Sequence, residues 1–414
     1  MNALSSLGLI LLIALLAGHL VKFLRIPEVT GYILAGILVG PSVLGWLTHD
    51  NVETLTVFSE VALGLILFSI GSVFEKERVM EMGAAVARLT IIESLTAGGL
   101  VALLALGFGQ PWQAALLLGA IAMETAAAST LMVLRECQAS GPLSDTLRGI
   151  IAINNIVCLV GFYLVASMVD LSVKIGQGEG VLWSLYASLF PLPWQVIGSA
   201  ALGYLIGLMI ASWAPRVHEH GEMLILLTGS ILLCVGAAVA FELSPLVASL
   251  AVGATMVNLS SGSRRMFQAL SRSDPPFYAI FFVLAGADLN LGLLKSMGPL
   301  GIGYIVARLA GKLIGARVGS RWTTLTAANR ALLGRAILSQ AGLAVGLTLT
   351  ISRRFPEFAP AVTTIVLSAV ACFEMIGPVS ARLAIVKSGE FHAHATETPG
   401  LLDVEPVPGP REVG

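Results

Sequence analysis

The sequence has few charged residues. Only 12% of its 414 residues are Asp, Glu, Lys or Arg, whereas a soluble domain normally carries about 25%. The formal net charge is −1, so bulk charge indicates neither a nucleic acid nor an acidic partner. Because 56% of the residues are hydrophobic, the composition predicts an integral membrane protein.

Cysteines and catalytic motifs are also scarce. The sequence contains no glycine-rich phosphate loop, no HExxH pattern and no nucleophile elbow, which argues against an enzyme and against a bound cofactor. The four cysteines lie within apolar segments and are typical of small hydrophobic residues, not of a disulfide framework or a metal site: Cys137, Cys158, Cys234 and Cys372.

Long hydrophobic runs dominate the sequence instead. Windows of roughly 20 apolar residues are what a membrane core requires, and their distribution predicts an all-α membrane protein with about thirteen transmembrane helices. Lys and Arg gather in the loops that follow the odd-numbered segments. This bias predicts that the N-terminus lies outside and the C-terminus in the cytoplasm. The first segment lacks a basic leader and a cleavage site, so we expect it to be a transmembrane helix.

Several polar side chains fall at membrane depth, where they are costly and therefore functional candidates. Lys312 lies in the middle of its segment, four residues after Arg308, so both face one side of a helix. A lysine at this depth needs a carboxylate, a cavity or a neutral state, and a structural pairing with a neighbouring helix is the alternative. Another segment carries two adjacent amides, Asn154 and Asn155. Three acids lie at similar depth elsewhere: Glu93, Glu124 and Glu374.

Two predicted segments are interrupted by polar residues. The fifth contains Glu124, Thr125 and Ser129, and the twelfth contains Ser339, Gln340 and Gly342. Transporters built from inverted repeats often have broken helices at matching positions in their two halves. Segments five and twelve are seven apart, which fits inverted five-helix repeats with two broken helices that cross. A plainer alternative is that these side chains bond to a neighbouring backbone carbonyl.

Seven stretches, taken in order, resemble the monovalent cation:proton antiporters of the group that includes Kef-type potassium efflux proteins and NapA-type sodium/proton antiporters. They are "IPEVTGYILAGILVGPSVLG", "FSEVALGLILFSIG", "STLMVLRECQASGPLSDTLRGIIAINN", "LSPLVASLAVGATMVN", "FFVLAGADLN", "SQAGLAVGL" and "FEMIGPVSARLAI". The resemblance implies a homodimer in a bacterial-type inner membrane that exchanges Na⁺ or K⁺ for protons by alternating access of a core against a dimer scaffold.

The resemblance also implies a division of the chain. Scaffold helices would occupy residues 1–80 and 223–294, a linker helix residues 190–214, and core helices residues 83–170 and 297–387. Residues 388–414 have four prolines and scattered charge, and we expect a disordered cytoplasmic tail.

In the resembled family, the sixth segment brings one or two aspartates to the crossing, and a lysine of the eleventh helix pairs with one of them. Lys312 matches this lysine, whereas Asn154 and Asn155 occupy the aspartate positions. An amide cannot titrate, although its carbonyl oxygen can bind a dehydrated cation. The usual proline of the fifth segment is also missing. Ala127 stands there, and alanine favours a continuous helix.

Two interpretations follow. In the first, exchange is coupled, Glu124 supplies the missing carboxylate and partners Lys312, and a supporting charge network contains Glu93, Arg308 and Glu374. In the second, an antiporter-fold protein has lost proton coupling and acts as a sensor or scaffold, or as an uncoupled path for an ion or solute. The expected partners are a monovalent cation, protons, membrane lipid and a second copy of the chain, with no nucleic acid, metal site or cofactor.

Overall fold

The computed structural model describes residues 3–24, 26–176, 190, 193–260, 262–289 and 291–392, and in these ranges the only regular elements are helices. Eight of the described helical spans are long and apolar enough to cross a membrane, and four shorter apolar helices accompany them. The prediction of an all-α membrane fold is therefore confirmed. The number of transmembrane helices and their orientation stay predictions.

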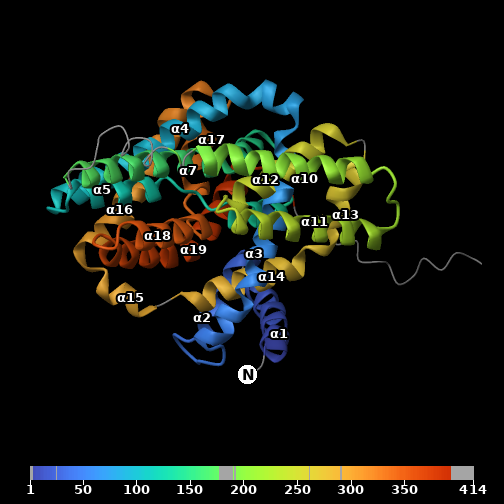
Figure 1. Ribbon diagram of the computed structural model, residues 1–414, viewed down its shortest axis with the longest axis horizontal. Helices are drawn as coiled ribbons and strands as arrows, with labels where there is room; N and C mark the ends of the chain where they lie inside the picture. Colours follow the sequence, from blue (N-terminus) through green and yellow to red (C-terminus); the bar gives the residue numbers. More distant parts are fainter. Residues whose placement is uncertain are drawn as a thin grey trace, which may run out of the picture.

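The helices follow one another along the chain as shown in Figure 1. Their bounds are α1 Ala3–Phe23, α2 Glu28–Val39, α3 His49–Gly71, α4 Lys76–Gly107, α5 Trp112–Ala122, α6 Ala127–Glu136, α7 Pro142–Gly176, α10 Ser199–Trp213, α11 His220–Ala240, α12 Pro245–Leu259, α13 Ser263–Ser273, α14 Pro275–Asp288, α15 Leu291–Ser296, α16 Gly298–Gly319, α17 Ala327–Ala336, α18 Gly342–Arg354 and α19 Ala359–Ser388. Short 3-10 helices at Ser72–Phe74 and Ser320–Trp322 and a π-helical turn at Trp194–Gly198 complete the described elements.

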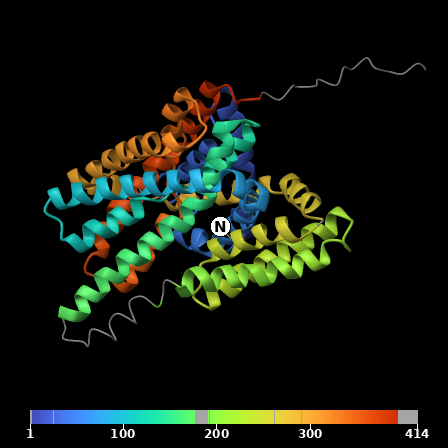
Figure 2. The same cartoon turned by 90° about the horizontal axis from the view of Figure 1, so that it is seen from above.

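The helices pack in two groups. In one, α2 and α3 contact α14, while α12 packs against α3, α10 and α11; in the other, α4 packs against α5, α7 and α16, and α19 packs against α17 and α18. Figure 1 shows α10, α11 and α13 on the right and α5, α16 and α18 on the left, and Figure 2 shows the same separation from above. The first group contains helices of the predicted scaffold ranges and also α10, which lies in the predicted linker range, while the second contains helices of the predicted core ranges. The division into scaffold, linker and core stays a prediction.

A stripe of glycines brings α16 close to α4. At Gly311 an added Cβ atom would lie 2.5 Å from the Cα atom of Ala97, and at Gly315 it would lie 2.6 Å from the Cα atom of Glu93. Small residues repeated every four positions allow two membrane helices to approach at backbone distance. The stripe therefore sets the neighbour of Lys312, which lies between these two glycines.

The end of α19 folds back onto the start of α7. Gly389 has a φ of 78°, the left-handed conformation in which helices often end. The next residue, Glu390, accepts backbone hydrogen bonds from Leu143 and Ser144, both at 2.7 Å. The expected disordered tail therefore does not begin at residue 388, because Glu390 binds the start of α7 and the backbone N–H of His392 donates to the backbone oxygen of Cys137, just after α6. Residues 393–414 of that predicted tail lie outside the described residues.

Candidate functional site

Lys312 is fully buried in α16 and pairs with an acid of α4. Its ammonium donates to Glu93 Oε2 at 2.9 Å, to the backbone oxygen of Met123 at 2.7 Å and to Thr125 Oγ1 at 2.8 Å. Three acceptors match its three N–H donors. The hypothesis that Glu124 partners Lys312 is wrong: Glu93 takes that place, because the glycine stripe brings α16 against α4.

Asn154 holds the break between α5 and α6. Its Oδ1 accepts from the backbone N–H of Thr125 at 2.7 Å, and its Nδ2 lies 3.0 Å from both the backbone oxygen of Met123 and Glu93 Oε1. Nδ2 also lies 2.9 Å from Ser94 Oγ. One side chain therefore supplies a donor and an acceptor to the free backbone groups of the break. An ionised aspartate has acceptors only, so it could not donate to Met123 and Glu93 as the amide does.

Both predicted interruptions are helix breaks. The helix of the fifth segment stops at Ala122 and resumes at Ala127, and that of the twelfth stops at Ala336 and resumes at Gly342. The breaks meet, since the backbone N–H of Ala126 donates to the backbone oxygen of Ser339 at 2.9 Å. The expectation that Ala127 favours a continuous helix is corrected, because side chains from α7 and α16 bind the freed backbone groups.

Arg308 joins the two breaks from α16. Its fully buried guanidinium donates to the backbone oxygens of Leu338 at 2.7 Å, Ser339 at 3.3 Å and Glu124 at 2.6 Å. It also lies 4.3 Å over the ring of Phe373 in α19. A cation at these carbonyl groups complements the negative ends of two helix dipoles. Arg308 therefore acts through backbone oxygens, not through an ion pair with a carboxylate of the described residues.

The side chains of Glu124 and Asn155 make no hydrogen bond to Lys312 and line a cavity instead. Both are buried, and both line a small cavity of about 20 Å³ with Ala127 and Gly342. Glu124 Oε2 accepts from the backbone N–H of Ala341 at 3.2 Å, whereas Asn155 makes no side-chain hydrogen bond to another described residue. The structure thus brings a carboxyl and an unused amide together at the crossing of the two breaks.

A wider cavity of about 850 Å³ adjoins the small one. Exposed charged residues of its rim, Glu60, Glu242 and Arg353, mark its opening at the molecular surface. The two cavities share five lining residues, which are Leu63, Leu67, Leu246, Gly342 and Leu343. The shared residues place the small cavity, which Glu124 lines, next to a cavity that opens at the molecular surface.

Of the remaining predicted site residues, one makes hydrogen bonds at the crossing and the other three have side-chain oxygens without a hydrogen-bond partner among the described residues. Gln340 donates to the backbone oxygen of Ile121 at 3.2 Å and to Tyr304 Oη at 3.1 Å, and so supports the crossing. The hydroxyl groups of Ser129 and Ser339 are buried without a hydrogen-bond partner among the described residues. Glu374 is buried too, and neither of its oxygens has such a partner. It therefore lies outside the expected network that contains Glu93 and Arg308.

Sequence reasoning missed two polar contacts of the site. Ser94 binds the Asn154 amide, and Tyr304 binds the Gln340 amide. A serine and a tyrosine are common in membrane helices, so neither stands out in an apolar segment. The signal that could have found Ser94 is its position directly after Glu93, the acid that pairs with Lys312.

Comparison with known proteins finds relatives that match most of the chain. A family model described as sodium/hydrogen exchanger, transmembrane, matches residues 8–383. The ammonium/H⁺ antiporter subunit AmhT of Alkalihalophilus pseudofirmus is 24% identical over 322 residues, which cover 78% of this chain and 79% of AmhT. The Na⁺/H⁺-K⁺ antiporter GerN of Bacillus cereus is 25% identical over 350 residues, which cover 82% of this chain and 85% of GerN.

The chain also matches part of a longer relative and the fold of a solved structure. The glutathione-regulated potassium-efflux protein KefC of Escherichia coli is 26% identical over 305 residues, and the match spans 69% of this chain but only 46% of KefC. The sodium proton antiporter MjNhaP1 of Methanocaldococcus jannaschii shares the fold, with a TM-score of 0.69, 18% identity, and coverage of 94% of this chain and 97% of that one. With the family model matching nearly its full length, the chain belongs to the sodium/hydrogen exchanger family.

Proposed function

We propose that this protein exchanges a monovalent cation, Na⁺ or K⁺, for protons across a bacterial-type inner membrane. The observation that carries the proposal is the position of Glu124. Its carboxyl lines the cavity at the crossing of both helix breaks, next to the wide cavity that opens at the surface. A carboxylate binds either a proton or a cation, which is the competition that antiport requires.

The groups around Glu124 favour cation binding there. Hard cations prefer oxygen ligands, and the Glu124 carboxylate and the Asn155 carbonyl both line the small cavity. Lys312 does not compete for Glu124, because its three donors bind Glu93, Met123 and Thr125. With one carboxyl at the cavity, we expect one proton to be exchanged for one cation, so that transport is electroneutral.

The position of the cavity also supports alternating access. On one side it is lined by Leu63 of α3, Leu246 of α12 and Phe281 of α14, and on the other by Glu124 and residues of the two breaks. The proposed site therefore lies where the two helix groups meet. A movement of the core helices against the scaffold helices would close access to the cation site from one face and open it from the other. The scaffold helices would also form the homodimer.

The alternative of lost proton coupling rests on the two amides. The contacts of Asn154 with the backbone of the first break support a structural role for one of them. The carboxyl required for coupling is present in Glu124. No specific observation favours the sensor, scaffold or uncoupled path.

Glu124→Gln tests the proposal in proteoliposomes that contain a pH-sensitive dye and receive a Na⁺ or K⁺ gradient. We expect cation-driven pH change to disappear, while the protein purifies normally, because a glutamine oxygen still accepts from Ala341. Glu222→Gln is the control. It makes the same change at an exposed position of α11, and exchange should persist. Exchange by Glu124→Gln at the unaltered rate would refute the proposal.

A further inference from the structure

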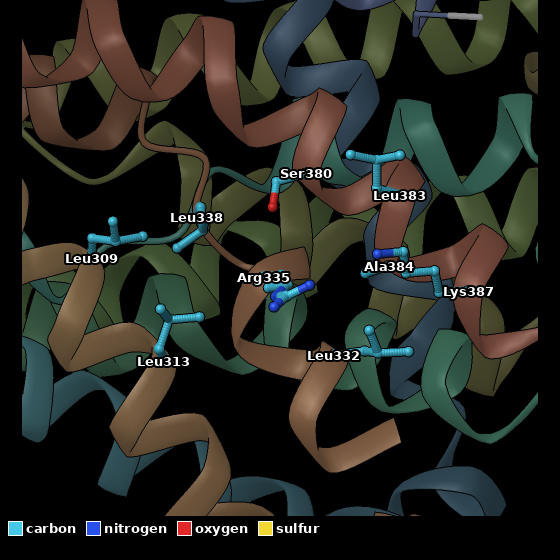
Figure 3. A pocket seen from close by; sticks show the side chains of 9 residues that line it. All are labelled: Leu309, Leu313, Leu332, Arg335, Leu338, Ser380, Leu383, Ala384 and Lys387. Carbon is cyan, nitrogen blue, oxygen red and sulfur yellow. The ribbon is translucent and has the colours of Figure 1, made fainter. Parts of the chain in front are cut away.

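A separate pocket of about 310 Å³ lies between α16, α17 and α19, near the end of α19. It shares no lining residue with the two cavities of the proposed cation site. Figure 3 shows Arg335 of α17 in its middle, with Leu309 and Leu313 of α16 on one side and Lys387 of α19 on the other. Exposure of Leu383, at 55%, shows that the pocket opens on the molecular surface.

The two cations of this pocket have no anion within the described part of the chain. Arg335 and Lys387 are exposed and make no hydrogen bond or ion pair with another described residue, and no Asp or Glu is among the described residues that line the pocket. Arg335 is eight residues beyond Ala327, the start of α17, and therefore about 12 Å along the helix. A cation on a helix that packs against α16 and α19, two candidate membrane spans, normally has a partner.

The rest of the pocket is apolar. Leu309, Leu313 and Leu383 come from two helices and form a surface along which an acyl chain can lie. Because α16 and α19, which supply this apolar wall, are long and apolar enough to cross a membrane, lipid is the molecule that meets it. Basic pockets between membrane helices are known to hold anionic headgroups. The charge of the pocket and its apolar wall thus match the two parts of one phospholipid.

We propose that this pocket binds an anionic phospholipid, with its phosphate between Arg335 and Lys387 and one acyl chain against Leu309, Leu313 and Leu383. In the orientation predicted from the loop charges, the lipid belongs to the cytoplasmic leaflet. Leu338, whose backbone oxygen binds Arg308, also lines the pocket. The bound lipid therefore packs against the end of a broken helix and stabilises the crossing.

A purely structural role for Arg335 makes a different prediction. Arg335 lies in the last turn of α17, where a positive charge complements the helix dipole without any ligand. In that case its removal would change stability by the same amount with every lipid. Dependence on the lipid headgroup separates the two roles.

The test uses the full-length protein purified in a neutral detergent, with the apparent melting temperature measured against added lipid. Phosphatidylglycerol should raise it in a saturable way, whereas phosphatidylcholine with the same acyl chains and soluble glycerol phosphate should not. Arg335→Gln with Lys387→Gln should weaken the apparent affinity on the order of thirtyfold. Arg335→Lys with Lys387→Arg keeps both charges and should restore binding.

The matched control removes two basic residues from another helix. Arg264 and Arg265 lie in α13, and their replacement by Gln changes the net charge equally but leaves the pocket intact. This variant should keep the affinity of the unaltered protein. If the double variant at the pocket does not fold, Lys387→Gln alone should bind about fivefold more weakly. Unchanged affinity in the pocket variants, or equal stabilisation by phosphatidylcholine, would overturn the proposal.

Discussion

Substitution of Asn154 by Asp tests whether the amide itself holds the first helix break. Asn154 Nδ2 lies 3.0 Å from Glu93 Oε1 and 3.0 Å from the backbone oxygen of Met123. An ionised aspartate would place a negatively charged acceptor against both oxygens. A protonated aspartate would donate one hydrogen bond, whereas the amide has two N–H donors. Either form removes at least one hydrogen bond that the amide donates, although Ser94 Oγ still donates to Glu93 Oε1 and Lys312 still donates to the backbone oxygen of Met123.

The expected loss of stability follows from these contacts. A buried hydrogen bond contributes about 0.5–1.5 kcal/mol, and one to a charged group contributes about 1.5–3 kcal/mol. In the ionised form the bonds from the amide to Met123 and to Glu93 are both lost, and the new charge stands beside Glu93. We therefore expect Asn154→Asp to lower the free energy of unfolding by about 2–5 kcal/mol.

Asn155 provides the matched control, because the same chemical change is made one residue further along α7. Its side chain lines the small cavity and makes no hydrogen bond to another described residue. Asn155→Asp adds a carboxyl beside Glu124 but breaks no such hydrogen bond, so it should cost less than Asn154→Asp. Unfolding of both variants can be measured by SDS titration in mixed micelles. Equal losses of stability in the two variants would refute the reasoning, since the effect would then follow from charge at this depth and not from the amide's contacts.

Two further substitutions examine the buried acids. Lys312→Met leaves Glu93 as a buried charge without its partner and should lower the free energy of unfolding by about 3–5 kcal/mol. In the same SDS titration, the double substitution Lys312→Met with Glu93→Leu should recover at least half of that loss. A double variant less stable than Lys312→Met would contradict this account. Glu374→Gln should change the free energy of unfolding by less than about 1 kcal/mol, because neither Glu374 oxygen has a hydrogen-bond partner among the described residues; a loss above about 2 kcal/mol would argue against it.

The depth of the polar residues was predictable from the sequence, but their direction was not. Lys312 lies in the middle of a hydrophobic run, so its burial and its need for an anion follow from the cost of a charge in the membrane. Its partner could be any acid at similar depth. The choice of Glu93 over Glu124 depends on the packing of α16 against α4. The glycines beside Lys312 predict close packing, but they do not name the helix that packs there.

The helix break at Met123–Ala126 shows how tertiary contacts override a local preference. Alanine at position 127 favours helix, and helix propensity contributes less than about 1 kcal/mol for an ordinary residue. Against it stand the hydrogen bonds that Lys312, Asn154 and Ser339 make to backbone groups of the break. Each comes from a segment distant in sequence. The break was therefore visible in the polar pattern of the segment, while its cause lies in the packed structure.

The two adjacent asparagines differ in role because neighbouring residues of a helix point about 100° apart. Asn154 faces the break, where only a group that both donates and accepts can bind Thr125 and Met123. Asn155 lines the cavity, where the proposed cation site would use only its oxygen. Glu124 lies between Met123 and Thr125 in the chain, yet its side chain lines the cavity while its two neighbours bind Lys312. One carboxyl is thereby separated from the lysine that its neighbours hold, and it is left available for a proton or a cation.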